Sequence, residues 1–314
     1  MKKILPILVI GIFVLSGLGA SAVNIEENNN EKKVIESSDR ATHTVLGEYG
    51  TATWCGYCKY AHGALKELYA EGQLDFYYVT LIDDMNTKAR TRCRTDFNIY
   101  GFPTVWWDGG RRVNVGAGSV PSAKSAYTSS INYLGSQSVK DVDINLKATW
   151  QGATSMSVEC EVKNNEANTY DGTIRVYIVE KESSMDWKDT GGALYTMAFL
   201  DWAFNEVISI PAAGSWSDTT TWNGAINGFP SVTQENTMVI AAVFNDEWHE
   251  GYSYPPSTNP FDAYYVDDVV GVSLKSKTAN DLQEILSNGF IGSLFLRFLE
   301  KHQNMFPLIQ KLLI

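Results

Sequence analysis

The chain has few basic residues for its length. Among its 314 residues, 25 are Lys or Arg and 36 are Asp or Glu, so the formal net charge is −11. The basic residues form no sustained stripe, and an acidic protein repels the phosphates of a nucleic acid. We therefore expect no nucleic-acid partner.

The acidic stretch 246–268 lacks the residue spacing of a known calcium-binding loop. The residues that could supply oxygen ligands there are Asp246, Glu247, Glu250, Asp262, Asp267 and Asp268. Calcium binds such oxygens, but these residues lack the spacing of an EF-hand loop. We expect solvated loops at these positions and no bound metal.

The N-terminus carries a targeting pattern. Lys2 and Lys3 precede the apolar stretch 4–18, and Ala20-Ser21-Ala22 matches an A-x-A cleavage site. We predict a secretory signal peptide at 1–22, with cleavage after Ala22. An uncleaved anchor is the alternative, although the apolar stretch is shorter than the about 20 residues of a membrane-spanning helix. The polar stretch 23–41 is predicted to be a flexible linker of an exported protein, in which disulfides persist.

Cysteines are scarce as well, and two of the four lie three positions apart. They are Cys55 and Cys58, in the segment Thr53-Trp54-Cys55-Gly56-Tyr57-Cys58-Lys59. An extended apolar run ends here and a helical pattern begins, so Cys55 is predicted at a helix N-terminus. Unpaired backbone N–H groups and the helix dipole stabilise a thiolate there. Cys58, one turn further, can attack a mixed disulfide at Cys55, which makes the pair a two-electron switch.

Zinc sites use the same cysteine spacing, so a second motif is needed to distinguish a redox pair from a zinc site. A zinc site could be built from Cys55, Cys58, His62 and Cys93. The segment Tyr100-Gly101-Phe102-Pro103-Thr104, followed by an apolar run, has no role in such a site. We therefore predict no metal, and we expect His62 on the helix surface.

Together, the two motifs resemble the thioredoxin family over residues 42–136. The resemblance implies disulfide exchange with protein thiols and disulfides, and it requires no organic cofactor. It implies that Cys55 is the sulfur that attacks the client disulfide and that Cys58 resolves the mixed disulfide. It also implies that Pro103 is a cis-proline packed beside the sulfurs. The residues expected to form a shallow client groove are Trp54, Tyr57, Phe102 and Thr104, together with that proline.

Two departures from the family leave parts of this hypothesis open. Gly56-Tyr57 replaces the Gly-Pro of reducing thioredoxins, so oxidase, reductase and isomerase all remain open, and the electron donor or acceptor is unidentified. The family also places a buried acidic proton acceptor on the strand before the motif. Glu48 is the candidate for this role, and a solvated carboxylate at the strand end is the alternative.

Residues 42–136 are predicted to follow a β-α-β-α-β-β-α plan, because apolar residues recur at strand and helix periods. The expected elements are a strand at 44–49, a helix at 56–71, a strand at 76–82, a helix capped by Asp83 or Asp84 and ending near Phe97, hairpin strands at 105–107 and 112–115, and a helix at 122–134. Cys93 lies among basic residues, which would favour its thiolate if it is exposed. A partly buried cysteine without function is the alternative.

Residues 139–275 are predicted to form a β-sandwich, because apolar and polar residues alternate between turn residues. The expected strands are 142–148, 156–162, 173–180, 206–210, 217–222, 238–244 and 264–274. The predicted fold class is therefore an α/β thioredoxin-like domain followed by an all-β immunoglobulin-like sandwich domain. This order resembles exported proteins related to the Omp28 group, which brings no established substrate. Cys160 is expected in the sandwich core, and a Cys93–Cys160 disulfide is an alternative.

Residues 276–314 are predicted to be a linker and an amphipathic tail. Apolar residues of 290–303 share one helical face, but charged residues interrupt the tail, so it does not span a bilayer. The tail could lie on a membrane surface or dock onto the protein. Peripheral association with a membrane or the cell surface through 290–314 is therefore expected.

The sequence thus favours an exported thiol–disulfide oxidoreductase, secreted or associated with the cell surface. A different class of protein remains as the alternative to an enzyme. In that alternative the protein is a non-catalytic surface binding or assembly protein, the sandwich binds the partner, and the thioredoxin fold serves as a scaffold. The intact set of Cys55, Cys58 and Pro103 favours the enzyme, because a scaffold would not need all three.

Overall fold

The computed structural model describes residues 43–274. The predicted signal peptide, the linker and the C-terminal tail lie outside this range. Among the described residues, no helix has both the length and the apolar character needed to cross a membrane.

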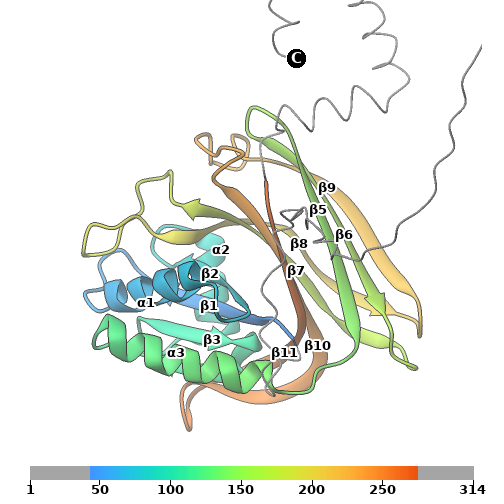
Figure 1. Cartoon of the computed structure of the whole chain (residues 1–314), viewed down its shortest axis with the longest axis horizontal. Coiled ribbons are helices and arrows are strands. Elements are labelled where there is room, and N and C mark those ends of the chain that lie inside the picture. Colours follow the sequence, from blue (N-terminus) through green and yellow to red (C-terminus); the bar gives the residue numbers. More distant parts are fainter. Residues whose placement is uncertain (1–42, 275–314) are drawn as a thin grey trace, which may run out of the picture. The chain divides into compact units, whose positions relative to one another are not determined.

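Eight strands of the described chain form one mixed sheet (Figure 1). Its order is β11-β10-β7-β8-β2-β1-β3-β4. The strands are β1 (Val45–Thr51), β2 (Phe76–Ile82), β3 (Thr104–Trp107), β4 (Arg112–Val115), β7 (Tyr170–Glu182), β8 (Thr196–Ile210), β10 (Thr237–Tyr254) and β11 (Thr258–Ser273). The junction between its halves is the parallel pairing of β2 with β8 at Thr80 and Ala198. The Thr80 hydroxyl also donates to the Thr196 carbonyl at 2.6 Å, which reinforces this junction.

This sheet corrects the predicted fold class. An α/β thioredoxin-like domain followed by a separate immunoglobulin-like sandwich is wrong, because strands expected in the sandwich share one sheet with β1 to β4. The described chain is mostly strand, and its α-helices are α1 (Cys58–Glu71), α2 (Thr87–Thr91) and α3 (Val120–Gly135). The physical reason lies in β2, which is buried along nearly its whole length. Such a strand needs a partner on each edge, and β8 supplies the second one.

A second sheet of three strands covers part of the long sheet (Figure 1). It contains β5 (Val142–Gly152), β6 (Ser155–Asn164) and β9 (Ser215–Asn223), in the order β5-β6-β9. Its alternating apolar residues, such as Val158 and Val162, are fully buried in the same core as β7, β8 and β10. Cys160 lies in this core as predicted, and it is a free cysteine, as is Cys93. The alternative of a disulfide between them is therefore wrong in this structure.

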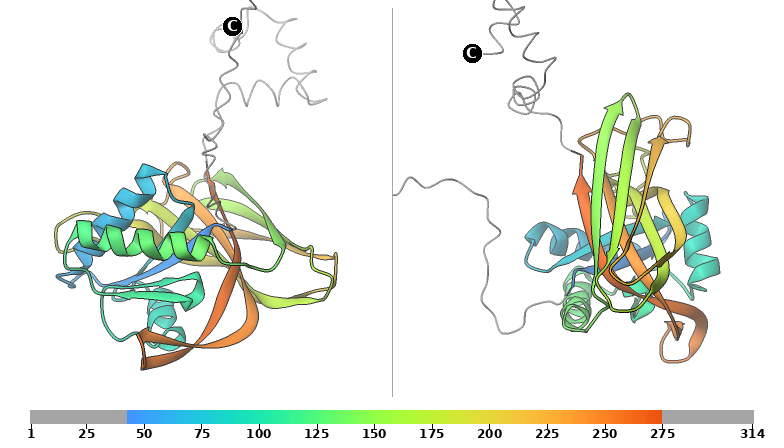
Figure 2. Two further views of the ribbon diagram at one scale, coloured as in Figure 1. Left: turned by 60° about the horizontal axis from the view of Figure 1, so that its bottom comes forward. Right: turned by 90° about the vertical axis from the view of Figure 1, so that its right-hand side faces the viewer.

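The helices lie on both faces of β1 to β3 (Figure 2). Helices α1 and α3 are side by side on one face, and α2 with the π-helical turn η1 (Arg92–Asp96) is on the other. Alternation along β3 explains this arrangement. The Trp107 ring contacts Tyr127 of α3 at 5.6 Å between centroids, and the Trp106 ring stacks on Phe97 at 4.3 Å.

The expected cap of the second helix is wrong. Neither Asp83 nor Asp84 caps α2, because Asn86 is the N-cap and its side chain accepts hydrogen bonds from the next turn. Asp83 instead pairs with Arg94 at 2.7 Å. Asp84 accepts from the Thr53 amide at 3.0 Å, so it supports the cysteine turn instead of a helix.

The turn after β3 docks against β11. Gly109 has φ of +69°, and a Cβ at this position would lie 1.9 Å from the Tyr264 carbonyl oxygen. Gly116 has a similar φ of +76°, but a Cβ there would meet nothing within 4 Å. The two glycines separate the cost of a left-handed backbone from the cost of a steric clash.

We predict that Gly109→Ala destabilises the protein more than Gly116→Ala does. The control Gly116→Ala should lower the free energy of unfolding by about 1 kcal/mol, the usual cost of a left-handed non-glycine residue. Gly109→Ala should lose about 2 kcal/mol more, because overpacking forces the backbone of β11 to shift. Urea denaturation of both variants measures the difference, and equal losses would contradict the docking of this turn on β11.

Candidate functional site

The two central cysteines are bonded to each other. Cys55 and Cys58 form a disulfide with a Cα–Cα distance of 5.4 Å. Cys58 is the first residue of α1, so Cys55 lies in the turn that precedes the helix. The Cys58 amide donates to the Cys55 carbonyl at 3.3 Å, which joins this turn to the helix. Cys55 is 5% exposed and Cys58 is fully buried.

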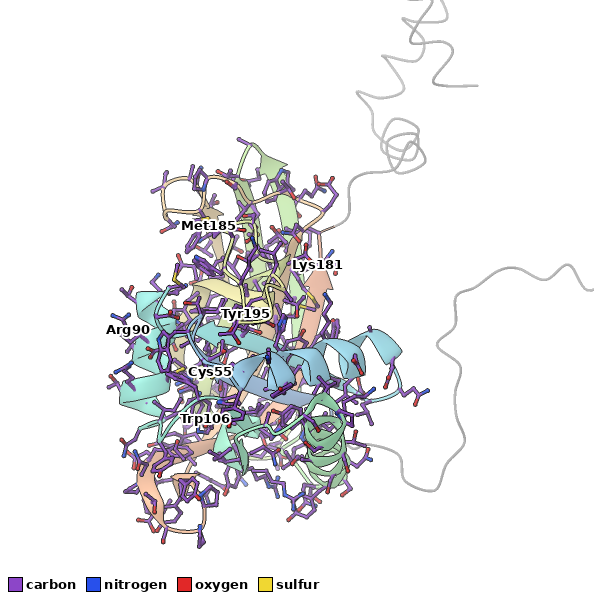
Figure 3. The ribbon with its side chains drawn as sticks, turned by 90° about the vertical axis from the view of Figure 1, so that its left-hand side faces the viewer. Cys55, Arg90, Trp106, Lys181, Met185 and Tyr195 are labelled. Carbon is purple, nitrogen blue, oxygen red and sulfur yellow. A yellow bond between two sulfur atoms is a disulfide. The ribbon has the colours of Figure 1, made fainter. Side chains whose placement is uncertain are left out.

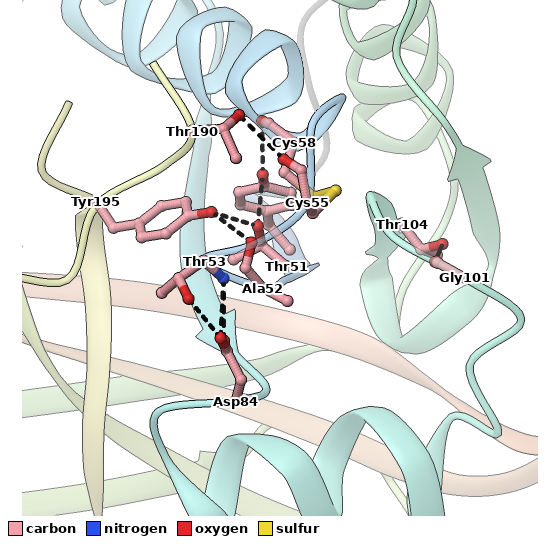
Figure 4. The surroundings of a disulfide bond; sticks show 11 residues. Thr51, Ala52, Thr53, Cys55, Cys58, Asp84, Gly101, Thr104, Thr190 and Tyr195 are labelled. Carbon is pink, nitrogen blue, oxygen red and sulfur yellow. Dashed lines mark hydrogen bonds between the residues drawn. A yellow bond between two sulfur atoms is a disulfide. The ribbon is translucent and has the colours of Figure 1, made fainter. Parts of the chain in front are cut away.

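The proline loop lies beside the sulfurs (Figure 4). The Phe102–Pro103 peptide bond is cis. Phe102 packs against the small cluster that contains both cysteines, and its ring meets Trp54 edge to face at 5.9 Å. Thr104 is buried and donates to the Gly101 carbonyl at 2.7 Å, which closes the loop. The structure thus brings this loop and the disulfide together.

Two aromatic side chains stand out from the surface around the disulfide. Trp54 is 66% exposed and Tyr57 is 65% exposed. Tyr57 also lies near Tyr60, with 6.5 Å between the ring centroids. Exposed aromatic rings next to a buried disulfide offer an apolar contact surface to a polypeptide.

Glu48, the candidate proton acceptor, lies inside the sheet and is fully buried. Its two carboxylate oxygens accept hydrogen bonds from the Arg92 guanidinium at 2.8 Å each, and the Tyr177 hydroxyl donates to one of them at 3.0 Å. The alternative of a solvated carboxylate is therefore wrong. Side chains alternate along a strand, so Glu48 faces away from the side of its neighbour Tyr49.

Tyr49 is the residue of β1 that reaches the cysteine pair. Its hydroxyl donates to the Cys58 carbonyl at 2.8 Å. Burial raises the pKa of Tyr49 well above its ordinary value, so the hydroxyl keeps its proton. The structure thus places a neutral hydrogen-bond donor, and not the Glu48 carboxylate, next to Cys58.

His62 is buried instead of lying on the helix surface, which corrects the expectation. It is 1% exposed, and its Nδ1 lies 2.8 Å from Asp189 Oδ2. The Thr196 amide donates to Nε2 at 3.2 Å, so Nε2 accepts and Nδ1 carries the proton. Burial lowers the pKa of His62, although the Asp189 carboxylate acts in the opposite direction.

Cys93 belongs to the other face of the sheet. It is fully buried, and burial raises its pKa well above the ordinary value, so the neighbouring basic residues do not make it a reactive thiol. A Cβ placed on Gly50 would lie 3.3 Å from the Cys93 sulfur, on the face that also holds Trp106. His62 lies on the opposite face of the sheet, the one that α1 covers. The structure therefore does not bring together the four residues of the zinc alternative.

One segment that contacts the disulfide turn could not be identified from the sequence. Residues 183–195 connect β7 to β8, and Thr190 and Tyr195 of this connection reach the turn (Figures 3 and 4). The segment Asp189-Thr190-Gly191-Gly192 contains turn-forming residues, but turn chemistry says nothing about a distant partner. Only the pairing of β8 with β2 places this connection beside α1.

The chain is similar to several solved structures. HBP35 of Porphyromonas gingivalis matches with a TM-score of 0.52 and 17% identity, over 74% of this chain and 75% of that one. A protein from Agrobacterium tumefaciens matches with a TM-score of 0.43 and 14% identity, over 75% of this chain and 96% of that one. A domain of the outer membrane lipoprotein Omp28 from P. gingivalis matches with a TM-score of 0.27 and 17% identity, over 44% and 91%.

Comparisons with protein-family models and with curated proteins found no match. The likeness to HBP35 shows a shared fold over most of the chain. The similar structures include an Omp28 domain. They do not confirm the thioredoxin family.

We predict that Arg92→Met lowers the free energy of unfolding by about 3–5 kcal/mol, because it leaves Glu48 buried without its counter-charge. The double variant Glu48→Gln with Arg92→Met should lose less than Arg92→Met alone, because a neutral amide replaces the stranded carboxylate. Urea denaturation monitored by Trp fluorescence measures all three proteins. A double variant that is no more stable than Arg92→Met would contradict this account of the pair.

We predict that His62 makes the protein less stable in mild acid. Its folded pKa lies below the unfolded value of about 6.5, so the unfolded chain binds the extra proton first. Stability is then unaffected above about pH 6.5 and falls as the pH drops from there towards the folded pKa. The charged neighbours Asp189, Lys66 and Glu182 act on the same group.

The variant His62→Gln removes this titration. Its free energy of unfolding should change less with pH below about 6.5 than that of the wild type, with a difference in slope of at most about 1.4 kcal/mol per pH unit. Urea denaturation at half-unit pH steps gives both slopes. Parallel curves for the two proteins would show that His62 is not the titrating group.

Proposed function

We propose that the protein is an exported thiol–disulfide exchange protein that acts on protein clients through Cys55 and Cys58. The observation that carries the proposal is the bond between two cysteines three positions apart, at the start of α1. This placement brings Cys55 close to the positive end of the helix dipole, which favours a thiolate. The predicted signal peptide is consistent with a compartment in which such a disulfide persists.

The exchange requires two steps and no organic cofactor. A client thiolate attacks the Cys55 sulfur, the Cys55–Cys58 bond breaks, and Cys58 leaves as a thiolate. A second client thiolate then attacks the client sulfur of the mixed disulfide and expels Cys55 as a thiolate. Two electrons thus pass from the client dithiol to the cysteine pair. In the reducing direction the same steps run backwards, with Cys55 as the attacking thiolate and Cys58 as the resolving one.

The surroundings of the disulfide suit a polypeptide client. Trp54 and Tyr57 are exposed, and Phe102 contacts both Trp54 and the small cluster that contains the cysteines. The sulfurs face the loop that contains Gly101 and Thr104 (Figure 4), so a client would approach from the side of that loop. Aromatic rings bind apolar side chains without demanding a particular sequence, which suits a protein that serves several clients. The electron donor or acceptor is a further protein partner of the proposal.

A second candidate function is non-catalytic binding at the cell surface. The observation that favours it is the burial of the sulfurs, because Cys55 is 5% exposed and Cys58 is 0% exposed. A buried disulfide can be a structural staple, and the exposed aromatic residues can then bind a partner without chemistry. In both proposals, the predicted tail at 290–314 would hold the protein near a membrane or the cell surface.

Reduction of insulin disulfides by dithiothreitol distinguishes the two functions. We predict that the wild type accelerates this reaction, that Cys55→Ser abolishes the acceleration, and that Cys58→Ser accumulates a mixed disulfide with insulin on non-reducing gels. The reason is that Cys58 is the sulfur that releases the client. Cys160→Ala, which removes a buried free thiol outside the site, is the matched control and should retain the activity.

The staple function gives a different pattern. The double variant Cys55→Ser with Cys58→Ser would then lose about 2 kcal/mol of stability, as expected for a short closed loop. Insulin reduction by the wild type would equal the blank, and Cys58→Ser would trap no client. That combination would overturn the exchange function and leave the binding function.

A further inference from the structure

Three hydroxyl groups hold the backbone of the cysteine turn (Figure 4). Each donates to a carbonyl oxygen, and the three carbonyls are spaced three residues apart along the turn. The pairs are Tyr195 to Ala52 at 3.2 Å, Thr190 to Cys55 at 3.3 Å and Tyr49 to Cys58 at 2.8 Å. Two of the three donors come from the β7–β8 connection.

Two of these carbonyls also form the turn itself. The Cys55 amide donates to the Ala52 carbonyl at 3.1 Å, and the Cys58 amide donates to the Cys55 carbonyl at 3.3 Å. The hydroxyls of Tyr195 and Thr190 therefore bind the two carbonyls that set the path of the chain from Ala52 through Cys55 to Cys58. Thr51 adds to this group, because its hydroxyl lies 2.8 Å from the Tyr195 hydroxyl.

A buried His–Asp pair fixes the β7–β8 connection on helix α1. His62 Nδ1 donates to Asp189 Oδ2 at 2.8 Å. The other carboxylate oxygen of Asp189 accepts from the amides of Gly191 at 2.8 Å and Ala193 at 3.2 Å, so it folds the tip of the connection. One carboxylate thus shapes the tip that carries Thr190 and ties it to the helix that begins at Cys58.

The ring of Tyr195 completes this attachment. Its centroid lies 5.0 Å from that of His62, and Tyr195 itself is fully buried. Figure 4 shows the Tyr195 hydroxyl pointing at Thr51 and Ala52, next to Cys55. The connection is therefore anchored at both ends of the segment 189–195, with the Tyr195 contact in the packed core and the Thr190 contact nearer the surface.

We infer that Thr190 and Tyr195 are positioning residues for the disulfide exchange, and that the His62–Asp189 pair holds them in place. The inference rests on the proposed function. When Cys55 and Cys58 are reduced, no covalent bond holds their sulfurs together. The hydroxyl contacts then keep the turn closed, so that the two thiols remain within reach of each other.

This arrangement sets the redox equilibrium of the pair. The tendency of a dithiol to close depends on the effective concentration of one thiol at the other, which rises when the backbone is preorganised. Loss of a hydroxyl contact lets the reduced turn open and lowers this concentration. The disulfide of such a variant is easier to reduce than that of the wild type.

The test is the equilibrium of Cys55–Cys58 in glutathione buffers, followed by alkylation of free thiols and mass spectrometry of the full chain. Thr190→Val replaces the hydroxyl with a methyl group at an exposed position, so it should fold. We expect it to lower the equilibrium constant for disulfide formation about threefold to tenfold, the range of one net hydrogen bond. Tyr195→Phe should lower it by a similar factor.

Two controls separate positioning from general destabilisation. Thr190→Ser retains a hydroxyl and should restore the constant to within twofold of the wild type. Ser184→Ala removes an exposed hydroxyl from the other end of the same connection, where the Ser184 amide bonds Glu180, and it should leave the constant unchanged. Equal constants for Thr190→Val, Tyr195→Phe and the wild type would overturn the inference, and so would an equal decrease in Ser184→Ala.

The glutathione equilibrium does not depend on any client. If the wild type does not accelerate the reduction of insulin but Thr190→Val shifts the glutathione equilibrium, the exchange function fails and the positioning role of the hydroxyls stands. If insulin is reduced but the equilibrium does not respond to Thr190 or Tyr195, the positioning role fails alone.

Discussion

The burial of β1 on both faces is the constraint on which the rest of the structure depends. All seven residues of Val45–Thr51 are buried, and a charged or polar side chain in such a strand must find a partner inside the protein. Glu48 finds Arg92 and Tyr177 on one face, and Tyr49 finds the Cys58 carbonyl on the other. One strand therefore anchors a buried ion pair with η1 and a hydrogen bond from β7, as well as the turn that carries the disulfide.

The continuous sheet explains why a late part of the chain reaches an early site. Because β8 pairs with β2, the residues before Thr196 run alongside the first turns of α1. A separate sandwich domain would have no reason to place Asp189 against His62. The fold therefore makes the site from two parts of the chain, with the cysteines and the proline loop from the first and the hydroxyl donors from the second.

The sequence predicts local features well and distant pairings poorly. Residues 76–82 form β2 with the predicted bounds, because a continuous apolar run between turn residues identifies a buried strand. The Cys55 and Cys58 spacing likewise identifies the disulfide. The first part of β8 cannot be recognised in the same way. Thr196–Ile210 is buried at its start and alternates only later, so no single period identifies the strand. The predicted surface position of His62 is wrong for a related reason, because its partner Asp189 is far away in sequence. The burial of Glu48 agrees with the prediction, but nothing local in the sequence identifies Arg92 and Tyr177 as its partners.

The three hydroxyl groups that hold the carbonyls of the cysteine turn are neutral, and this determines how those contacts respond to pH. Burial raises the pKa values of Tyr49 and Tyr195 above their ordinary value, so both hydroxyls remain protonated donors throughout the range in which a cysteine titrates. They can therefore hold the carbonyls of Ala52 and Cys58 without adding a charge that would compete with a thiolate. His62, which ties the β7–β8 connection to α1, does titrate in acid, and its neutral form is the one that accepts the Thr196 amide. Acid should then loosen the β7–β8 connection before it disturbs the tyrosine donors themselves.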